Sequence, residues 1–195
     1  LKPNVGRISR QGLIPISHSQ DTPGPLTRNV ADALLLLEVL EGEDLQDPTT
    51  ALAPGKSEIP EFQIKSDRLE GIRIGVARNL YHRDSRMEQL LDDAVRALID
   101  LGAVVKDSLY LDNTMLLKMP ELEVLLHEFK LGINAYLGNL EDHPEHPSPP
   151  KSLKELITFN QAHQEQVMPF FAQELFEKAE RRGDLSSEIY LESLK

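Results

Sequence analysis

The first periodic run of apolar residues predicts a helix that ends near Gly42. Between Thr27 and Gly42 the apolar positions recur three or four residues apart, the spacing of one helix face. These positions are Val30, Ala33, Leu34, Leu37 and Leu40. Thr27 or Asn29 can cap the start of the helix, and Gly42 supplies a natural stop.

The segments on either side of this helix have weaker patterns. Residues 4–16 contain short extended pieces broken by Gly12 and Pro15, which suggest an edge strand or a strand remnant. Residues 43–68 are rich in Asp, Pro, Gly and Ser. We expect a long surface connection there, without a packed element.

The middle of the chain predicts a βαβ unit. "GIRIGVA" at 71–77 alternates apolar residues on one strand face, and "AVV" at 103–105 resumes strand character. Between them, Ser85 followed by Glu88 is a capping-box pattern, and Gly102 supplies a stop. The apolar stripe of this helix is Met87, Leu90, Leu91, Ala94, Leu98 and Leu101. If both strands share a sheet, the crossover is right-handed.

The last third of the chain is predicted to be helical. A long helix follows Pro120, which is tolerated in a first turn, and a proline-rich polar loop follows at 141–150. Ser152 with Glu155 caps another helix to about residue 162, and residues 168–183 predict a further one. Its apolar side is Phe170, Leu175 and Phe176, and the chain ends with helical spacing at Ile189, Leu191 and Leu194. The predicted fold class is α/β, with a partial mixed sheet, a βαβ unit, surrounding helices and a helix-rich C-terminal third.

Composition narrows the classes of protein. The 195 residues are 40% apolar, which supports a real core. A net charge of −11 would repel a phosphate backbone, so nucleic acid is not an expected partner. No apolar window reaches the length of a membrane span, and no signal segment opens the chain, so we expect no membrane partner. The absence of cysteine excludes disulfides and thiolate chemistry, and it fits a reducing, cytoplasmic location.

The stretch "SHSQD" offers serine, histidine and aspartate within five residues, but it does not predict a catalytic triad. A triad needs three side chains that converge within hydrogen-bond reach, usually from distant parts of the sequence. Neighbouring residues of an extended segment point to opposite faces. Ser17, His18, Ser19 and Asp21 are therefore expected in a polar loop that leads into the helix.

Other candidate sites have simpler interpretations. His143, Glu145 and His146 could be offered as metal ligands, but flanking prolines keep them off one helix face, which favours a solvated loop. Glu121 and Glu123 near a helix start would complement its dipole. "GIRIGVARNL" lacks the glycine pattern of a dinucleotide site.

Taken together, residues 1–50 resemble the amidase signature family in the stretch just downstream of its serine- and glycine-rich signature. The residues that fall in the family's order are Leu1-Lys2-Pro3, Val5-Gly6, Ser9-Arg10, Gly12, Ser17 to Asp21, Gly24-Pro25, Arg28, Asp32 and the Asp44 to Asp47 turn. "LLHEFKLGINAYL" and "FNQAHQEQVMPFFAQELFEKA" look like the branch with peptide amidases and 6-aminohexanoate cyclic dimer hydrolases. The resemblance spans nearly the whole chain and is loosest across 50–70 and 141–150.

The resemblance implies a Ser-Ser-Lys mechanism without a cofactor or metal, whose catalytic residues lie upstream of the motif at which this sequence begins. Lys2 belongs to that motif and is not the catalytic lysine, so no catalytic residue is assigned. Residue 1 is Leu, so we expect a piece of a larger amidase domain, comprising a motif segment and helix (1–49), the βαβ unit (71–106) and a helical region (115–195). Alone, this piece is predicted to be inactive and prone to self-association.

The expected activity of the full-length protein is hydrolysis of linear, peptide-like carboxamides, with a small-molecule amide as substrate. One alternative is the A subunit of glutamine-dependent tRNA amidotransferase, against which "EFKLGINAYL" argues. Another is a non-enzymatic binding or scaffold domain on the same fold. The segment around His127 and Glu128 faces substrate in relatives, so both are predicted to bind substrate; otherwise this helix is simply half exposed.

Overall fold

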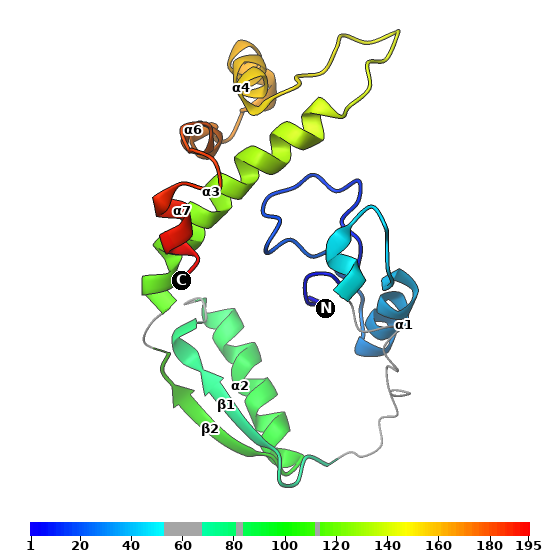
Figure 1. Cartoon of the computed structure of the whole chain (residues 1–195). Helices are drawn as coiled ribbons and strands as arrows, with labels where there is room; N and C mark the ends of the chain where they lie inside the picture. The colour runs from blue at the N-terminus through cyan, green and yellow to red at the C-terminus, as the bar shows by residue number, and fades with distance from the viewer. Residues whose placement is uncertain (53–67, 81–83, 112–113) are drawn as a thin grey trace. The chain divides into compact units, whose positions relative to one another are not determined.

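The computed structural model describes residues 1–52, 68–80, 84–111 and 114–195. The chain divides into two compact units, which we treat separately: a motif unit of residues 1–59 and 118–195, and a βαβ unit of residues 60–117. The α/β class is confirmed, with helices in both units and a small parallel sheet in the second (Figure 1).

The βαβ unit has the predicted order of elements. Strand β1 (Arg73–Ala77) is followed by the short 3-10 turn η2 (Arg78–Leu80), helix α2 (Ser85–Asp100) and strand β2 (Val104–Leu109). β1 and β2 pair in parallel, with Arg73 opposite Val104 and Gly75 opposite Lys106. Both strands therefore share one sheet, as the sequence pattern predicted.

The start of α2 differs from the prediction. Its N-cap is Asp84, whose carboxylate accepts a hydrogen bond from the backbone N–H of Arg86. Ser85 is already the first helical residue, because the carboxylate one position earlier takes the capping role. The buried side of α2 also differs from the predicted stripe: Val95, which is not in that stripe, is buried, whereas Met87 and Leu90 are exposed.

Helix α1 (Val30–Leu40) opens the motif unit and is capped by Asn29, whose side chain accepts from the Asp32 N–H at 2.9 Å. Asn29 rather than Thr27 is therefore the cap. Ala33 and Leu37 are buried, which confirms part of the predicted face. The two ends of that face, Val30 and Leu40, are 60% and 48% exposed.

Two predictions about the segments beside α1 are corrected. Residues 4–16 form no strand, only an isolated antiparallel bridge between Ile8 and Glu41, because Gly6 turns the chain in a left-handed conformation with a φ of 87°. Residues 43–52 are not a mere surface connection: they form the 3-10 helix η1 (Pro48–Leu52), and Thr50 is buried. The rest of the predicted connection, residues 53–67, lies outside the described residues.

The long helix α3 (Thr114–Gly138) begins earlier than predicted. Pro120 lies inside the helix and not in its first turn. Proline lacks the N–H that would donate to the carbonyl four residues before it. The helix nevertheless continues on both sides of Pro120. The preference of proline for the first turn of a helix therefore did not determine where α3 begins.

The remaining helices lie beside α3 (Figure 1): α4 (Leu153–Ala162), α5 (Gln164–Val167), α6 (Glu174–Glu180) and α7 (Glu188–Ser193). The predicted cap of α4 is confirmed, since Ser152 Oγ accepts from the Glu155 N–H at 3.2 Å. The predicted helix over 168–183 is only partly formed, because Pro169 restricts Met168 and α5 ends there. Phe170 is consequently 91% exposed instead of packed.

The core of this helical region is formed by buried side chains on α3, α4 and α6. They are Leu126, Ile133, Leu137, Leu153 and Ala179. Phe129 and Phe176 stack beside them with ring centroids 5.2 Å apart. None of the helices in the described part of the chain is long and apolar enough to cross a membrane.

Leu153→Ala should lower the free energy of unfolding by about 3 kcal/mol, because the side chain is fully buried and its loss leaves a cavity. Leu175→Ala is the matched control: the same atoms are removed from a side chain that is 54% exposed. We expect a change below about 0.5 kcal/mol there. Equal losses in urea denaturation would contradict this packing.

Candidate functional site

The carboxylate of Glu128 on α3 is the centre of a buried polar cluster. Its Oε2 accepts hydrogen bonds from the Ser17 hydroxyl, the Ser19 N–H at 3.1 Å and the Ser19 hydroxyl at 2.9 Å. Its Oε1 accepts one from the Tyr190 hydroxyl on α7 at 2.8 Å. A buried carboxylate is tolerated only when its oxygens are satisfied in this way. Glu128 thus joins α3 to a loop more than a hundred residues away in sequence and to α7.

The loop that Glu128 holds is also closed by Asp21. The Asp21 carboxylate accepts from the N–H groups of Ile16 at 2.8 Å and Ser17 at 2.9 Å. In turn, the N–H of Asp21 donates to the carbonyl of Ser17 at 2.8 Å. Loop 16–21 is therefore fixed from inside by Asp21 and from outside by Glu128.

The pKa values of the cluster follow its contacts. Burial is the largest influence on Glu128 and raises the pKa of its carboxyl, but the hydrogen bonds from Ser17, Ser19 and Tyr190 outweigh it. The pKa of Glu128 consequently lies below its ordinary value. Burial, together with the neighbouring Glu128 carboxylate, raises the pKa of Tyr190 to about 12. The cluster therefore holds a carboxylate and a neutral phenol at neutral pH.

His18 is an exposed member of this cluster. Its Nδ1 lies 3.4 Å from Glu128 Oε2, and its side chain is 56% exposed whereas that of Glu128 is fully buried. His18 therefore lies beside the buried carboxylate with more than half of its side chain open to solvent.

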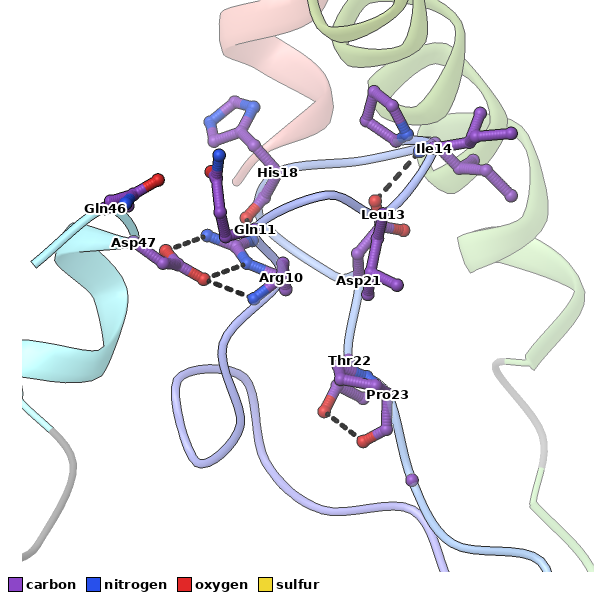
Figure 2. Close-up of a pocket in the computed structure, with 13 residues that line it drawn as sticks. Arg10, Gln11, Leu13, Ile14, His18, Asp21, Thr22, Pro23, Gln46 and Asp47 are labelled. Atoms are coloured by element: carbon purple, nitrogen blue, oxygen red, sulfur yellow. Dashed lines mark hydrogen bonds and ion pairs between the residues drawn. The ribbon is translucent and has the colours of Figure 1, made fainter. Parts of the chain in front are cut away.

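A surface pocket of about 610 Å³ adjoins this loop and is lined by the segments 10–24 and 46–47 (Figure 2). Ile16, His18 and Asp21 of the fixed loop line it, as do the apolar side chains of Leu13 and Ile14. Clefts with an apolar lining and a few placed polar groups are typical ligand sites. This pocket, next to the Glu128 cluster, is therefore a candidate ligand site.

Arg10 and Asp47 form one wall of the pocket, and Figure 2 shows their paired groups facing each other. Asp47 accepts from the Arg10 backbone N–H, Nε and Nη2, each at 2.9 Å, and Arg10 Nη1 donates to the His18 carbonyl. Hydrogen bonds from Arg10 hold the pKa of the Asp47 carboxyl far below its ordinary value, and the same pairing raises the pKa of Arg10. The pair is structural, since it ties the turn at Asp47 to the fixed loop.

His127, next to Glu128 on α3, also contacts α7. Its Nδ1–H donates to the carbonyl oxygen of Glu123 at 2.8 Å, so Nε2 is the acceptor for the Ser187 hydroxyl at 2.9 Å. Ser187 is the N-cap residue of α7, and this bond docks α7 on α3. Glu123 also pairs with Arg182 through two hydrogen bonds of 2.7 Å, and Arg182 lowers the pKa of Glu123.

The structure places the two predicted substrate-binding residues next to each other but in the interior. His127 and Glu128 are each 1% exposed, and the partners described above are protein groups. This helix segment is therefore not half exposed, and the role of both residues in substrate binding stays a prediction. Ser17, His18 and Ser19, which the sequence assigned to a plain polar loop, are gathered around Glu128 instead.

Some contributors were not predicted as site residues. Tyr190 was overlooked because the apolar spacing at the chain's end pointed to Ile189, Leu191 and Leu194. These three are about half exposed, and Tyr190 is buried between them. Arg10 and Asp47 did carry a signal, since both fall within the motif positions of the resemblance, but no spacing argument could pair them.

The loop candidate for a metal does not assemble a site. The rings of His143 and His146 lie 4.8 Å apart, and His143 Nδ1 accepts from the Glu145 N–H at 3.2 Å. Within the described ranges, no three His, Asp or Glu side chains come together in a way that could hold a metal ion.

Comparison with known proteins identifies the family. The Amidase family model matches residues 1–192. A probable amidase of Arabidopsis thaliana is 36% identical over 190 residues, which is 92% of this chain and 34% of that protein. The crystal structure of the peptide amidase from Stenotrophomonas maltophilia is similar over 98% of this chain and 38% of that one, with a TM-score of 0.77 and 36% identity.

Part of the chain is also similar to another member of the group. The A subunit of glutamyl-tRNA(Gln) amidotransferase from Pseudomonas syringae pv. syringae is 39% identical over 110 residues, or 55% of this chain and 22% of that protein. The fold and the family match define an amidase-type α/β protein. The chain belongs to the amidase signature family. It spans about a third of the length of the Arabidopsis amidase and of the peptide amidase, two relatives that match nearly all of it.

Asp47→Asn should cost about 3 kcal/mol of unfolding free energy at pH 7, because it leaves the Arg10 guanidinium without its anion. Since the pKa of Asp47 is lowered in the folded state, its stabilisation is fully present above the ordinary carboxyl pKa, about 4. It is lost as the pH falls below that value. The difference between the two proteins in urea denaturation should therefore shrink between pH 5 and pH 2.

Asp93→Asn is the control for this measurement, because Asp93 forms an exposed ion pair with Arg96 within α2. We expect a change of at most about 0.5 kcal/mol at any pH. A cost of Asp47→Asn that does not vary with pH would contradict the assigned ion pair.

Proposed function

We propose that the whole protein that carries this chain is an amidohydrolase that cleaves linear carboxamides. The observation that carries this proposal is the family match over residues 1–192, together with structural similarity to a peptide amidase over 98% of the chain. A small uncharged amide is the substrate class, and the cytoplasm is the expected location.

The reaction that we propose is acyl transfer through a Ser-Ser-Lys set that lies outside this chain. A serine attacks the amide carbonyl, ammonia or an amine leaves, and water hydrolyses the acyl-enzyme. Donors of an oxyanion hole stabilise the charge that develops on the carbonyl oxygen. This proposal is supported by the contacts of a lysine and two serines of this chain, which are engaged in structural hydrogen bonds. Lys130 donates to two backbone carbonyls at 2.7 and 2.8 Å, and Ser17 and Ser19 are bound to Glu128.

His127 and Glu128 enter this function through the groups that they hold. Glu128 fixes loop 16–21, which lines the pocket, and His127 docks α7, from which Tyr190 reaches Glu128. Their effect on substrate selection is therefore proposed to be indirect, through the conformation of the loop.

The second candidate is the A subunit of a glutamine-dependent tRNA amidotransferase. It is favoured by the 39% identity to that subunit, but over 55% of this chain, whereas the likeness to peptide amidase extends over 98%. A non-enzymatic binding or scaffold domain on the same fold is the third. If this third candidate is correct, the whole protein should lack the two serines and the lysine of the catalytic set.

The test of the proposed activity is release of ammonia from amide substrates by the whole protein. We expect turnover of N-acetylated amino acid amides and of short peptide amides, and unchanged rates after treatment with EDTA. Substitution of the upstream serine nucleophile by alanine is the control and should abolish turnover. Ammonia release from glutamine that depends on a partner subunit and on glutamyl-tRNA would favour the second candidate instead, and no turnover of any amide would favour the third.

Residues 1–195 alone should be inactive and should self-associate. Inactivity follows from the absence of the proposed nucleophile, without which positioning groups accelerate little. Association is expected because large apolar side chains such as Leu26, Val39 and Phe170 are 95%, 79% and 91% exposed. The net charge of −11 opposes it, so the effect should grow with salt. Light scattering over a concentration series measures it; a strictly monomeric chain that hydrolyses an amide would contradict both expectations.

A further inference from the structure

We propose that the pocket beside loop 16–21 takes an uncharged apolar group of the amide substrate, with His18 as its polar contact and Glu128 as the residue that positions His18. This inference rests on the proposed function and assigns the substrate preference of that site. It is carried by three features: the charge state of the pocket, its apolar lining and the orientation of His18.

The guanidinium in the pocket wall is already engaged by protein groups. Nε, Nη1 and Nη2 of Arg10 are all hydrogen-bonded, to Asp47, to the His18 carbonyl and to Thr49. Asp21, which accepts two backbone N–H groups, and Asp47 also line the pocket. A substrate carboxylate would meet two acidic side chains and a guanidinium that is already paired with Asp47, so an acidic group is disfavoured.

The apolar part of the lining is accessible and continuous along the sequence. Leu13, Ile14 and Ile16 are 45%, 68% and 55% exposed, and all three line the pocket. Each apolar carbon that a ligand withdraws from water against such side chains contributes to binding. A volume of about 610 Å³ accommodates a side chain or acyl group of several carbons.

His18 supplies the directional contact. Its Nδ1 lies 3.4 Å from Glu128 Oε2 and its side chain is 56% exposed, so the rest of the ring is accessible to a ligand. A neutral imidazole offers one acceptor nitrogen and one N–H donor. An amide N–H of a peptide-like substrate is the matching donor. Glu128 does not touch the ligand in this arrangement; it acts through His18 and through the Ser17 and Ser19 bonds that hold the loop.

The experiment uses the whole protein and three probes of similar size: N-acetyl-leucinamide, N-acetyl-asparagine amide and the α-amide of N-acetyl-aspartate. We expect the leucine derivative to be preferred and the aspartate derivative to be the poorest. Ile14→Ser should lower kcat/KM for the leucine probe about tenfold and leave the asparagine probe nearly unchanged. Equal kcat/KM values for the leucine and aspartate probes would overturn the assignment of the pocket.

His18→Ala separates a ligand contact from a structural role. A lost contact that is equal in the ground state and the transition state raises KM and leaves kcat unchanged, and we expect a rise of about tenfold for the two neutral probes. A structural defect would lower the fraction of active protein, so that kcat falls at constant KM. That result, or no change in either constant, would overturn the role of His18. His143→Ala, in the loop at 141–150, is the matched control and should change neither constant.

Glu128→Gln tests the positioning role. It should raise KM for the neutral probes, and the double variant with His18→Ala should be less impaired than the sum of the two single variants, because part of the effect of Glu128 passes through His18. Additive effects on KM would overturn the positioning role, and a thermal unfolding scan verifies that each variant is folded.

A binding measurement distinguishes failure of this inference from failure of the proposed function. Saturation-transfer NMR detects N-acetyl-leucinamide on the protein whether or not it is hydrolysed. Binding that requires His18 in a protein without amidase activity would retain the pocket and reject the activity. Hydrolysis with His18-independent binding would retain the activity and reject the pocket.

Discussion

The motif unit depends on one buried charge. The Glu128 carboxylate is removed from water, and an isolated carboxylate in that position would cost several kcal/mol. Its oxygens are instead satisfied by groups from two other parts of the chain, the loop at 17–19 and the start of α7. Because the anion is stable only when all of them are in place, the three segments hold one another in a single arrangement.

The pocket is a consequence of this arrangement. Loop 16–21 has no helix or strand of its own, so its shape comes from Asp21 inside it and Glu128 beneath it. The Arg10–Asp47 pair then fixes the opposite wall and is joined to the loop through the His18 carbonyl. A site whose walls are fixed before a ligand arrives loses less conformational entropy on binding.

Local structure could be predicted from the sequence where short-range interactions decide it. The Asn29 and Ser152 caps and the strand alternation in β1 depend on residues within a few positions of each other. Errors arose where a competing neighbour or the tertiary structure decided: Asp84 displaced Ser85 as a cap, and α3 continued through Pro120. The contact between Ser17 and Glu128 spans 111 residues, and no periodicity predicts a pairing at that separation.

The fate of "SHSQD" shows why a list of reactive residue types does not define a site. Serine, histidine and aspartate side chains do lie close together there. The hydroxyls of Ser17 and Ser19, however, donate to the Glu128 carboxylate, and the Asp21 carboxylate accepts backbone N–H groups. A hydroxyl that donates to a buried carboxylate is held in place and is not activated as a nucleophile by a neutral base. Among the described residues, His18 makes no such bond through its ring, and its side chain is 56% exposed. The polar groups of this loop therefore fix its conformation, and for this reason three reactive residue types that are neighbours in the sequence do not make a catalytic set.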